Sequence, residues 1–469
     1  MPLRVSSALA ILLVAYGALL FTHLCDIAGG SDSSGYLNEA RMIVSGRTAE
    51  RIDALDRFHL DDSVADVFVP LGYDVMPLHR RMMVPTYPPG LPMHMALFTL
   101  IGGDRAGFCV VPLAAIAAIA LMSLLARMLL DSWSLAIASA VALASCAVFV
   151  FHALQPVSDA LVTMWSIAAI AAALHARRAG DRWGALGGAA FAIGIWIRPS
   201  NILLAPALFM ALPKRKHAVI AAAIVLAPLL IWSARLYGAP LRTGYGSIAQ
   251  YLSLDYFPAR SLHYLRWTAA LLSPFVLLGA IDSTIRAPRD RIQLMLALWW
   301  WPYFLFYCFF SSYESWSYTR FLLPAYPALI VSALMMARRV SPRAAPAVVA
   351  CAMIACAIFF TRRLDVLHIE RVESIYPEVL RWSDAQIPRD ALVVAMQLSG
   401  ARKYDRGEWS LRWEWLDRER VQKIERAVPP QRWYAVLWPF EVDEVRRRVP
   451  GQWTKIGEDR DVTLWHRTR

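Results

Sequence analysis

Apolar stretches of about 20 residues, separated by short polar segments, recur along most of this chain, and this is the length that a helix needs to cross a bilayer. One apolar stretch, residues 183–212, is interrupted by the sequence IRPSN, which predicts two short helices with Arg198 near the bend. With these two, the pattern predicts about eleven transmembrane helices. The other predicted spans cover residues 7–25, 106–127, 132–152, 156–176, 217–237, 266–284, 292–311, 320–338 and 344–361.

Two regions depart from this pattern. A long polar excursion, residues 26–105, follows the first span, and from about Leu364 the composition becomes that of a soluble domain. We therefore predict a polytopic α-helical membrane domain over residues 1–363, with a long first outer loop, and a small α/β domain over residues 364–469. The elements predicted in the second domain are two short strands, two amphipathic helices and a terminal hairpin, at residues 391–396, 433–438, 417–428, 440–449 and 453–467.

Composition and charge agree with a membrane protein. The chain is 58% hydrophobic and 18% charged, with a mean hydropathy of +0.42, whereas soluble proteins carry about 25% charged residues. The formal net charge is +12, and basic residues cluster in short loops such as PKRK, RAPRDR and RRVSPR. Cytoplasmic loops of membrane proteins carry such an excess. Membrane topology, rather than nucleic-acid binding, therefore explains the charge.

The same bias predicts the orientation in the cytoplasmic (inner) membrane. Arg4 precedes the first span and places the N-terminus in the cytoplasm, and an odd number of spans places the C-terminal domain outside. The first apolar run is expected to remain as a span, because no A-x-A-like cleavage site follows it. The six cysteines form no CxxC pair, so neither a disulfide framework nor a zinc site is indicated.

Asp32 lies just after the first span, in the sequence GGSDSSGYLNEARMIVSGR. The spacing of Tyr36, Leu37, Ala40, Ile43 and Val44 gives one apolar helical face, and we expect this helix to lie along the membrane interface. The helix is predicted to end at Gly46. Asp32 is then either an N-cap or a carboxylate at the mouth of a cavity in the membrane.

The first outer loop ends in VPTYPPGLPMH, residues 84–94, which contains Tyr87. Its prolines fix the backbone, and a stiff loop that re-enters the membrane accounts for them. Arg81 precedes this segment, together with His79 and Arg80. These basic side chains either meet a lipid phosphate or face water.

Three charged residues lie at the ends of predicted spans. Asp159 occurs at the start of a helix in QPVSDA, where either the helix dipole accounts for it or the carboxylate has a functional role. Arg198 is flanked by long apolar runs, and an arginine at membrane depth must be paired or face a cavity. Arg320 lies at the mouth of a span in SYTRFLLPAYPAL, where snorkelling is the alternative. Both arginines suit a phosphate ligand.

Five motifs, in their order along the chain, resemble those of the GT-C membrane glycosyltransferases, the group that contains protein mannosyltransferases and lipid A aminoarabinose transferases. The motifs are Asp32 with SGYLNEA, then TYPPG, QPVSDA, IRPSN and RFLLPAYPAL. The likeness covers about residues 1–365, and the C-terminal domain is similar to those appended to some bacterial members. The resemblance implies a bacterial cell-envelope enzyme that takes a sugar from a polyprenyl phosphate at the outer face of the membrane.

The resemblance also implies roles for residues. The usual catalytic carboxylate lies in the first outer loop, and by this motif the role carries over to Asp32. Members often have two acidic residues near this position, whereas here Glu39 lies inside the helix. A divalent metal is therefore possible, and no cofactor is certain. The substrate-binding candidates are Arg198, Arg320, Asp159, Glu39, Tyr87 and Arg81.

The chemistry of such a donor suits these residues. Polyprenyl phosphate is a good leaving group, so one carboxylate that deprotonates the acceptor hydroxyl is sufficient, and a cation stabilises the departing phosphate. We expect Asp32 to be the base, Arg198 or Arg320 to hold the phosphate, and Asp159 and Glu39 to position the substrate or a metal. One-step displacement predicts inversion. The donor sugar, a hexose or a pentose, and the acceptor, a lipid, glycan or protein, are left open.

Two other classes of function remain. A transporter or lipid flippase also explains Arg198 and the interrupted apolar segment, because discontinuous helices mark transporter sites. The absence of an inverted repeat and the two long outer loops argue against it. A non-catalytic assembly protein that binds partners through its C-terminal domain is the third hypothesis.

Overall fold

The computed structural model describes residues 3–469 and divides into two compact units. The helical unit comprises the chain up to Leu24, Phe108–Leu229 and Ser247–Ile369. The mixed unit comprises Cys25–Gly107, Leu230–Gly246 and Glu370–Arg469. The polar segment after the first span and the C-terminal segment therefore fold together, although most of the helical unit separates them in sequence.

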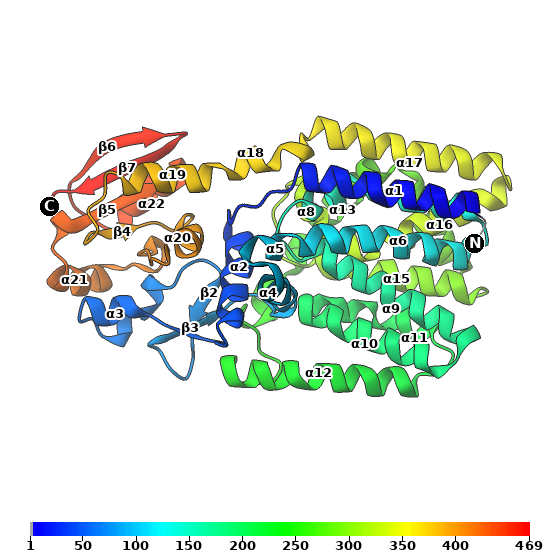
Figure 1. Ribbon diagram of the computed structural model, residues 1–469, viewed down its shortest axis with the longest axis horizontal. Coiled ribbons are helices and arrows are strands. Elements are labelled where there is room, and N and C mark those ends of the chain that lie inside the picture. Colours follow the sequence, from blue (N-terminus) through cyan, green and yellow to red (C-terminus); the bar gives the residue numbers. More distant parts are fainter. Residues whose placement is uncertain (1–2) are drawn as a thin grey trace. The chain divides into compact units, whose positions relative to one another are not determined.

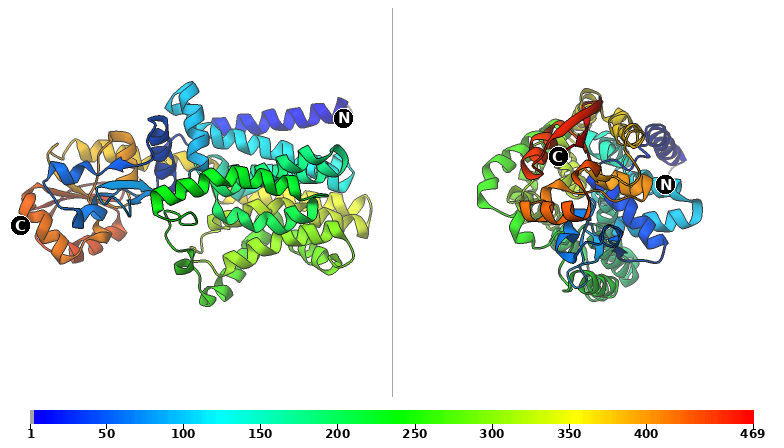
Figure 2. Two further views of the ribbon diagram at one scale, coloured as in Figure 1. Left: turned by 90° about the horizontal axis from the view of Figure 1, so that it is seen from below. Right: turned by 90° about the vertical axis from the view of Figure 1, so that its left-hand side faces the viewer.

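Apolar helices of different lengths run alongside one another in the helical unit (Figures 1 and 2). They are α1 (Leu3–Thr22), α6 (Val110–Leu130), α7 (Trp133–Ser145), α8 (Ala147–Ala153), α9 (Asp159–Ala179), α10 (Asp181–Ile197), α11 (Ala205–Ala211), α13 (Phe257–Leu272), α14 (Phe275–Arg286), α15 (Arg291–Cys308), α16 (Tyr326–Val340) and α17 (Ala344–Arg363), with the 3₁₀ helices η2 (Pro199–Leu204), η3 (Ile248–Tyr251), η4 (Leu254–Tyr256) and η5 (Trp316–Ala325). Two helices, α5 (Asp104–Phe108) and α12 (Lys216–Tyr237), continue from one unit into the other.

The predicted fold class, a polytopic helical membrane protein with a small α/β part, is confirmed. Within residues 3–469, six helices are long and apolar enough to cross a membrane, or up to eight if each of two bent pairs is one span. The estimate of about eleven also counted α10, the segment Pro199–Ala211 and α15. The first two are short, with 17 and 13 residues, and α15 is rich in Trp, Tyr and Pro, which lower its hydropathy.

The break at Arg198 is confirmed. Helix α10 ends at Ile197, and Arg198 has an extended backbone with φ −149° and ψ 112°. Pro199 begins η2, and a proline disfavours helical backbone for the residue before it. The chain therefore leaves the helix at Arg198 and resumes in a short 3₁₀ turn.

The mixed unit contains two sheets. The first is antiparallel with the order β1–β3–β2, and the second has the order β4–β5–β7–β6, in which only β4 and β5 are parallel. The strands are β1 (Glu50–Arg51), β2 (Tyr73–Val75), β3 (Met82–Pro85), β4 (Leu392–Val394), β5 (Trp433–Leu437), β6 (Trp453–Asp459) and β7 (Val462–Arg467). The helices are α2 (Ser31–Val44), α3 (Asp53–Arg57), η1 (Asp62–Phe68), α4 (Gly90–Gly102), α19 (Ile375–Asp384), α20 (Ser399–Arg406), α21 (Arg418–Ala427) and α22 (Pro439–Arg448).

One hydrophobic core joins the two sequence segments of the mixed unit. Leu55 and Phe68, from the first segment, are buried in the same cluster as Trp433, from β5. A backbone hydrogen bond of 2.7 Å from Arg412 N to Val67 O also links the segments. Residues 25–107 are therefore an integral part of this unit and not only a connection between spans.

Candidate functional site

Asp32 lies within the first turn of α2. The helix begins at Ser31, Gly30 occupies the N-cap position, and no side chain caps this end. The N-cap interpretation of Asp32 is therefore wrong, because a capping side chain must precede the helix. The half-buried carboxylate instead lies where the positive end of the helix dipole stabilises it. At the other end, Gly46 has a φ of 72°, which confirms the predicted helix stop.

The Tyr87 side chain packs against this first turn. Its hydroxyl lies 2.6 Å from the Ser31 hydroxyl, and its ring centroid lies 4.7 Å from that of Tyr36. Burial, followed by the negative charge of Asp32, raises the pKa of the Tyr87 phenol well above its usual value. Tyr87 is therefore protonated near neutral pH and can donate a hydrogen bond beside the carboxylate.

Gly35 permits this close packing. A Cβ atom at position 35 would lie 2.3 Å from the Tyr87 ring, which is far inside van der Waals contact. Gly72 lies against the same helix with a φ of 88°, and its Cβ would lie 2.5 Å from the Gly35 Cα. The close packing of Tyr87 therefore requires a glycine at position 35, and the helical pattern of the sequence did not reveal this requirement.

Glu39 lies on the same helix and is fully buried. Within residues 3–469, neither of its carboxylate oxygens has a hydrogen-bond partner. Burial raises the pKa of the Glu39 carboxyl well above its usual value. A metal ligand must be deprotonated, so this environment disfavours Glu39 as a ligand. The part of the chain that the structure describes also contains no group of three or more His, Cys, Asp and Glu side chains placed to hold a metal.

Arg81 is held by two carboxylates. Its guanidinium lies 2.7 Å from Asp56 and 2.6 Å from Asp62, and these hydrogen bonds raise the pKa of Arg81. The pairing ties the start of β3 to the segment around α3 and η1. A contact between Arg81 and a lipid phosphate stays a prediction from the sequence.

In the helical unit, three predicted residues come together: Asp159 in the first turn of α9, Arg198 at the break and Arg320 in η5. Arg198 Nη2 lies 2.8 Å from Asp159 Oδ1, and Arg320 Nη1 lies 3.8 Å from Asp159 Oδ2. Arg198 also donates a hydrogen bond of 3.1 Å to the Ser158 hydroxyl. One carboxylate thus fixes two guanidinium groups from distant parts of the sequence. We call these three residues the arginine pair site.

The exposed fractions of the side chains suggest how this site works. Asp159 is 0% exposed, whereas Arg198 and Arg320 are 14% and 16% exposed. The carboxylate therefore lies behind the two cations. Two guanidinium groups carry two positive charges, and Asp159 carries one negative charge. The site therefore keeps a net positive charge, which attracts a further anion.

Aromatic and amide side chains support the arginine pair site. The Phe321 ring lies 5.6 Å from Arg198 Cζ and 5.4 Å from Arg320 Cζ, within cation–π range. At the break, buried Asn201 accepts hydrogen bonds of 2.8 Å from both Ser166 and Tyr303. These contacts were not predicted from the sequence. Asn201 lies in the IRPSN motif, three residues after Arg198, and a polar amide within an apolar stretch was the one signal that could have indicated it.

Solved structures with the same fold are known. The chain is similar to ArnT from Cupriavidus metallidurans bound to undecaprenyl phosphate, with a TM-score of 0.59, 16% identity and 97% of each chain covered. It is also similar to the Archaeoglobus fulgidus oligosaccharyltransferase tethered with an acceptor peptide, with a TM-score of 0.60, 10% identity, and 100% of this chain and 74% of that chain covered.

The same archaeal enzyme, AglB, in complex with an inhibitory peptide and a dolichol-phosphate, gives a TM-score of 0.54 at 11% identity, with 100% of this chain and 74% of that chain covered. The likeness confirms the predicted fold, which this chain shares with ArnT and AglB. No protein family profile matches the sequence, and no curated protein sequence matches it significantly.

Proposed function

We propose that the protein is a membrane glycosyltransferase that uses a sugar linked to a polyprenyl phosphate. The observation that carries this proposal is the arginine pair site, in which one buried carboxylate orients two partly exposed guanidinium groups in an apolar helical unit. Arginine binds phosphate in a bidentate manner, and a lipid phosphate is the anion that a membrane supplies. Proteins with the same fold have been solved with undecaprenyl phosphate and with a dolichol-phosphate.

In the proposed reaction, Asp32 takes the proton of the acceptor hydroxyl while the hydroxyl oxygen attacks the anomeric carbon of the donor. The bond from that carbon to the phosphate oxygen breaks, and its electron pair leaves with the polyprenyl phosphate. Arg198 and Arg320 stabilise the charge that develops on the phosphate. A single displacement of this kind inverts the anomeric centre. The proposed location is the outer face of the cytoplasmic membrane.

Tyr87 and Ser31 are proposed to orient groups next to the base. Their hydroxyls lie 2.6 Å apart at the turn of α2 that carries Asp32. The protonated Tyr87 phenol has a hydrogen bond with Asp32, and this contact orients the carboxylate toward the acceptor. Such fixed donors raise the rate by positioning the reacting groups.

The test is a transfer assay with purified protein in nanodiscs and a polyprenyl-phosphate sugar labelled in the sugar. We expect release of polyprenyl phosphate from the wild type. The Asp32→Asn variant should lose about 10²-fold or more of this activity with its donor affinity retained, and Arg198→Gln together with Arg320→Gln should weaken donor binding. The control variant is Asp131→Asn, which removes an exposed carboxylate at the end of α6. Full activity in Asp32→Asn would remove Asp32 as the base.

A lipid transporter is the second candidate, because the arginine pair site includes the break between α10 and η2, and interrupted helices are typical of transporter sites. To test this, the protein is placed in liposomes that carry labelled sugar-linked lipid in one leaflet, instead of in nanodiscs. Movement of intact sugar-linked lipid across the membrane, without loss of the sugar, would favour the transporter over the transferase.

A further inference from the structure

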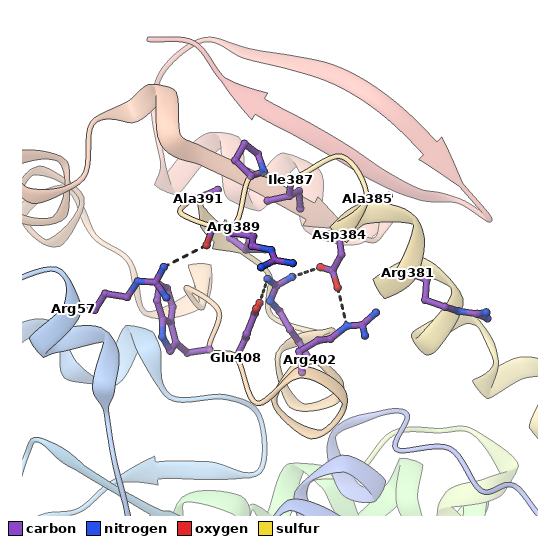
Figure 3. Close-up of a pocket in the computed structure, with 13 residues that line it drawn as sticks. Arg57, Arg381, Asp384, Ala385, Ile387, Arg389, Ala391, Arg402 and Glu408 are labelled. Carbon is purple, nitrogen blue, oxygen red and sulfur yellow. Dashed lines mark hydrogen bonds and ion pairs between the residues drawn. The ribbon is translucent and has the colours of Figure 1, made fainter.

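A cavity of about 670 Å³ lies in the mixed unit (Figure 3). Its charged lining is strongly unbalanced, because it contains five arginines but only two acidic residues. The arginines come from the end of α3, from α19, from the loop before β4 and from α20. They are Arg57, Arg381, Arg389, Arg402 and Arg406, and the acidic residues are Asp384 and Glu408.

Four of these charges neutralise one another. Arg402 Nη1 lies 2.9 Å from Asp384 Oδ1, and Arg402 Nη2 contacts Glu408. Arg406 Nε lies 2.9 Å from Asp384 Oδ2. The dashed lines of Figure 3 mark these contacts. The two acidic residues are therefore matched by Arg402 and Arg406, and the other three arginines remain as excess positive charge.

The other three arginines have no carboxylate partner within residues 3–469. Arg57 donates a hydrogen bond of 3.3 Å to the Arg389 carbonyl, and Arg381 donates one of 3.2 Å to the Pro377 carbonyl. No ion pair involves Arg389 in the described part of the chain. The Arg381 side chain points away from the other arginines of the lining (Figure 3). Arg57 and Arg389 place like charges on one cavity, and these charges repel each other. An anion in the cavity would relieve this repulsion.

Arg402 provides a second, independent indication of a ligand. Arg402 is 7% exposed, and its Nε has no hydrogen-bond partner within residues 3–469. A buried N–H without an acceptor is unfavourable, so native proteins satisfy nearly all such donors. Because Arg402 lines the cavity, a bound oxyanion or water would supply the missing acceptor.

One wall of the cavity is aromatic. The Trp409 ring lies 5.0 Å from the Phe58 ring and 5.6 Å from the Phe68 ring, in edge contacts that fix its orientation. Arg57 Cζ lies 5.9 Å from the same indole. Pockets for small molecules combine such apolar walls with a few charged groups that orient the ligand, and their volumes are about 300–1,000 Å³. An indole beside guanidinium groups fits a ring with apolar C–H faces and an acidic substituent.

We propose that this cavity binds an acidic saccharide. Its oxyanion, a carboxylate or a phosphate, lies on Arg57 and Arg389, and its ring lies against Trp409. In the proposed transferase this site holds the acceptor glycan, a statement that rests on the proposed function. Binding of the saccharide itself does not depend on that function.

Calorimetry with the full-length protein in detergent tests the binding. The probes are trigalacturonate and glucose 6-phosphate, which present the carboxylate and the phosphate separately, and maltotriose, which is neutral. We expect at least one acidic probe to bind, more weakly as the salt concentration rises, and maltotriose to give no heat. The double variant Arg57→Gln/Arg389→Gln should bind about tenfold more weakly or worse, since it removes charge-assisted hydrogen bonds.

The control variant is Arg426→Gln, which removes one exposed arginine of α21 outside the cavity and should bind as the wild type does. Neither Arg57 nor Arg389 is buried, so the double variant should retain the thermal midpoint of the wild type. Equal binding of acidic and neutral probes would overturn the proposal, as would wild-type affinity in the double variant. A single-stranded oligonucleotide that binds as tightly as the saccharides, and is lost in the double variant, would reassign the cavity to general polyanion binding.

The Asp32→Asn variant separates this proposal from the proposed function. It should bind the acidic probe with the affinity of the wild type while transfer is lost. Saccharide binding without any transfer activity in the wild type would sink the transferase and leave the cavity assignment in place. Transfer activity in a protein that binds no acidic probe would overturn the cavity assignment and leave the proposed transferase in place.

Discussion

The three acidic residues predicted at the site lie in three different environments, and each environment limits the role of its residue. Asp32 is half-buried beside a tyrosine, Asp159 is fully buried between two arginines, and Glu39 is fully buried without a hydrogen-bond partner in residues 3–469. A general base must be ionised and reachable. Of the three, only Asp32 is partly exposed.

Replacement of Glu39 by glutamine should change the pH dependence of stability. The folded-state pKa of Glu39 is raised above its ordinary value of 4.5, so the unfolded state ionises first. Stability is then full below pH 4.5 and falls by about 1.4 kcal/mol per pH unit above it, until the folded-state pKa is reached. The Glu39→Gln variant does not lose stability in this way, because glutamine does not ionise. Thermal unfolding in detergent from pH 5 to pH 8 should show that the advantage of the variant grows with pH. Parallel curves for the two proteins would contradict the assignment.

Replacement of Asp159 by asparagine should be strongly destabilising. The change removes the carboxylate that Arg198 and Arg320 share, and breaking a buried ion pair costs about 3–5 kcal/mol. The matched control is Asp181→Asn, whose contact with Lys214 is 3.5 Å long and exposed, and such pairs contribute about 0–1 kcal/mol. Denaturation in mixed micelles gives both values. Equal effects of the two variants would show that Asp159 is not the anchor of the arginine pair site.

At the scale of elements, the sequence predicted those segments whose order is local. Helix α21 was predicted because its apolar residues recur with helical spacing, and the break at Arg198 because a proline follows. In the structure Asp417 caps α21 with a hydrogen bond of 2.9 Å from Arg420 N. The sheet β1–β3–β2 was not predicted, because its strands have two to four residues and show no periodicity. Their pairing depends on the C-terminal segment that shares their core. Likewise, the sequence placed Asp32 and the two arginines at outer helix ends, but Arg57 and Trp409 become neighbours only in the folded unit.

A glycine in α2 provides a test at this scale. A methyl group at position 35 would lie 2.3 Å from the Tyr87 ring, so Gly35→Ala must displace either the ring or the helix. We expect transfer activity to fall about tenfold or more, because a displacement of about 1 Å in a positioned group has such effects, while Ala is the better helix former. At Gly30 a Cβ would meet nothing closer than 3.4 Å, which makes Gly30→Ala the control. If both alanine variants retain activity, the position of Tyr87 is not important for the reaction.

At the scale of the whole molecule, the mixed unit is assembled from segments on either side of the helical unit in the sequence. Leu55 and Phe68 share a core with Leu392 and Trp433. The Leu71 amide donates a hydrogen bond of 3.0 Å to the Ser399 hydroxyl. A domain of this size depends on nearly all of its apolar burial for stability. Residues 370–469 therefore lack part of their own core when the first segment is absent.

Two fragments test this dependence. Residues 370–469 expressed alone should not unfold cooperatively, because the apolar surface around Trp433 would be exposed and an exposed patch of this kind favours aggregation. A second fragment, in which residues 47–86 are joined to residues 370–469 by a flexible linker, restores strands β1–β3 and should unfold with a single transition. Near-ultraviolet circular dichroism during heating distinguishes the two, because the tryptophans report fixed packing. A cooperative transition in residues 370–469 alone would show that the C-terminal segment is an independent domain, and that the first polar segment is an addition to it rather than half of its core.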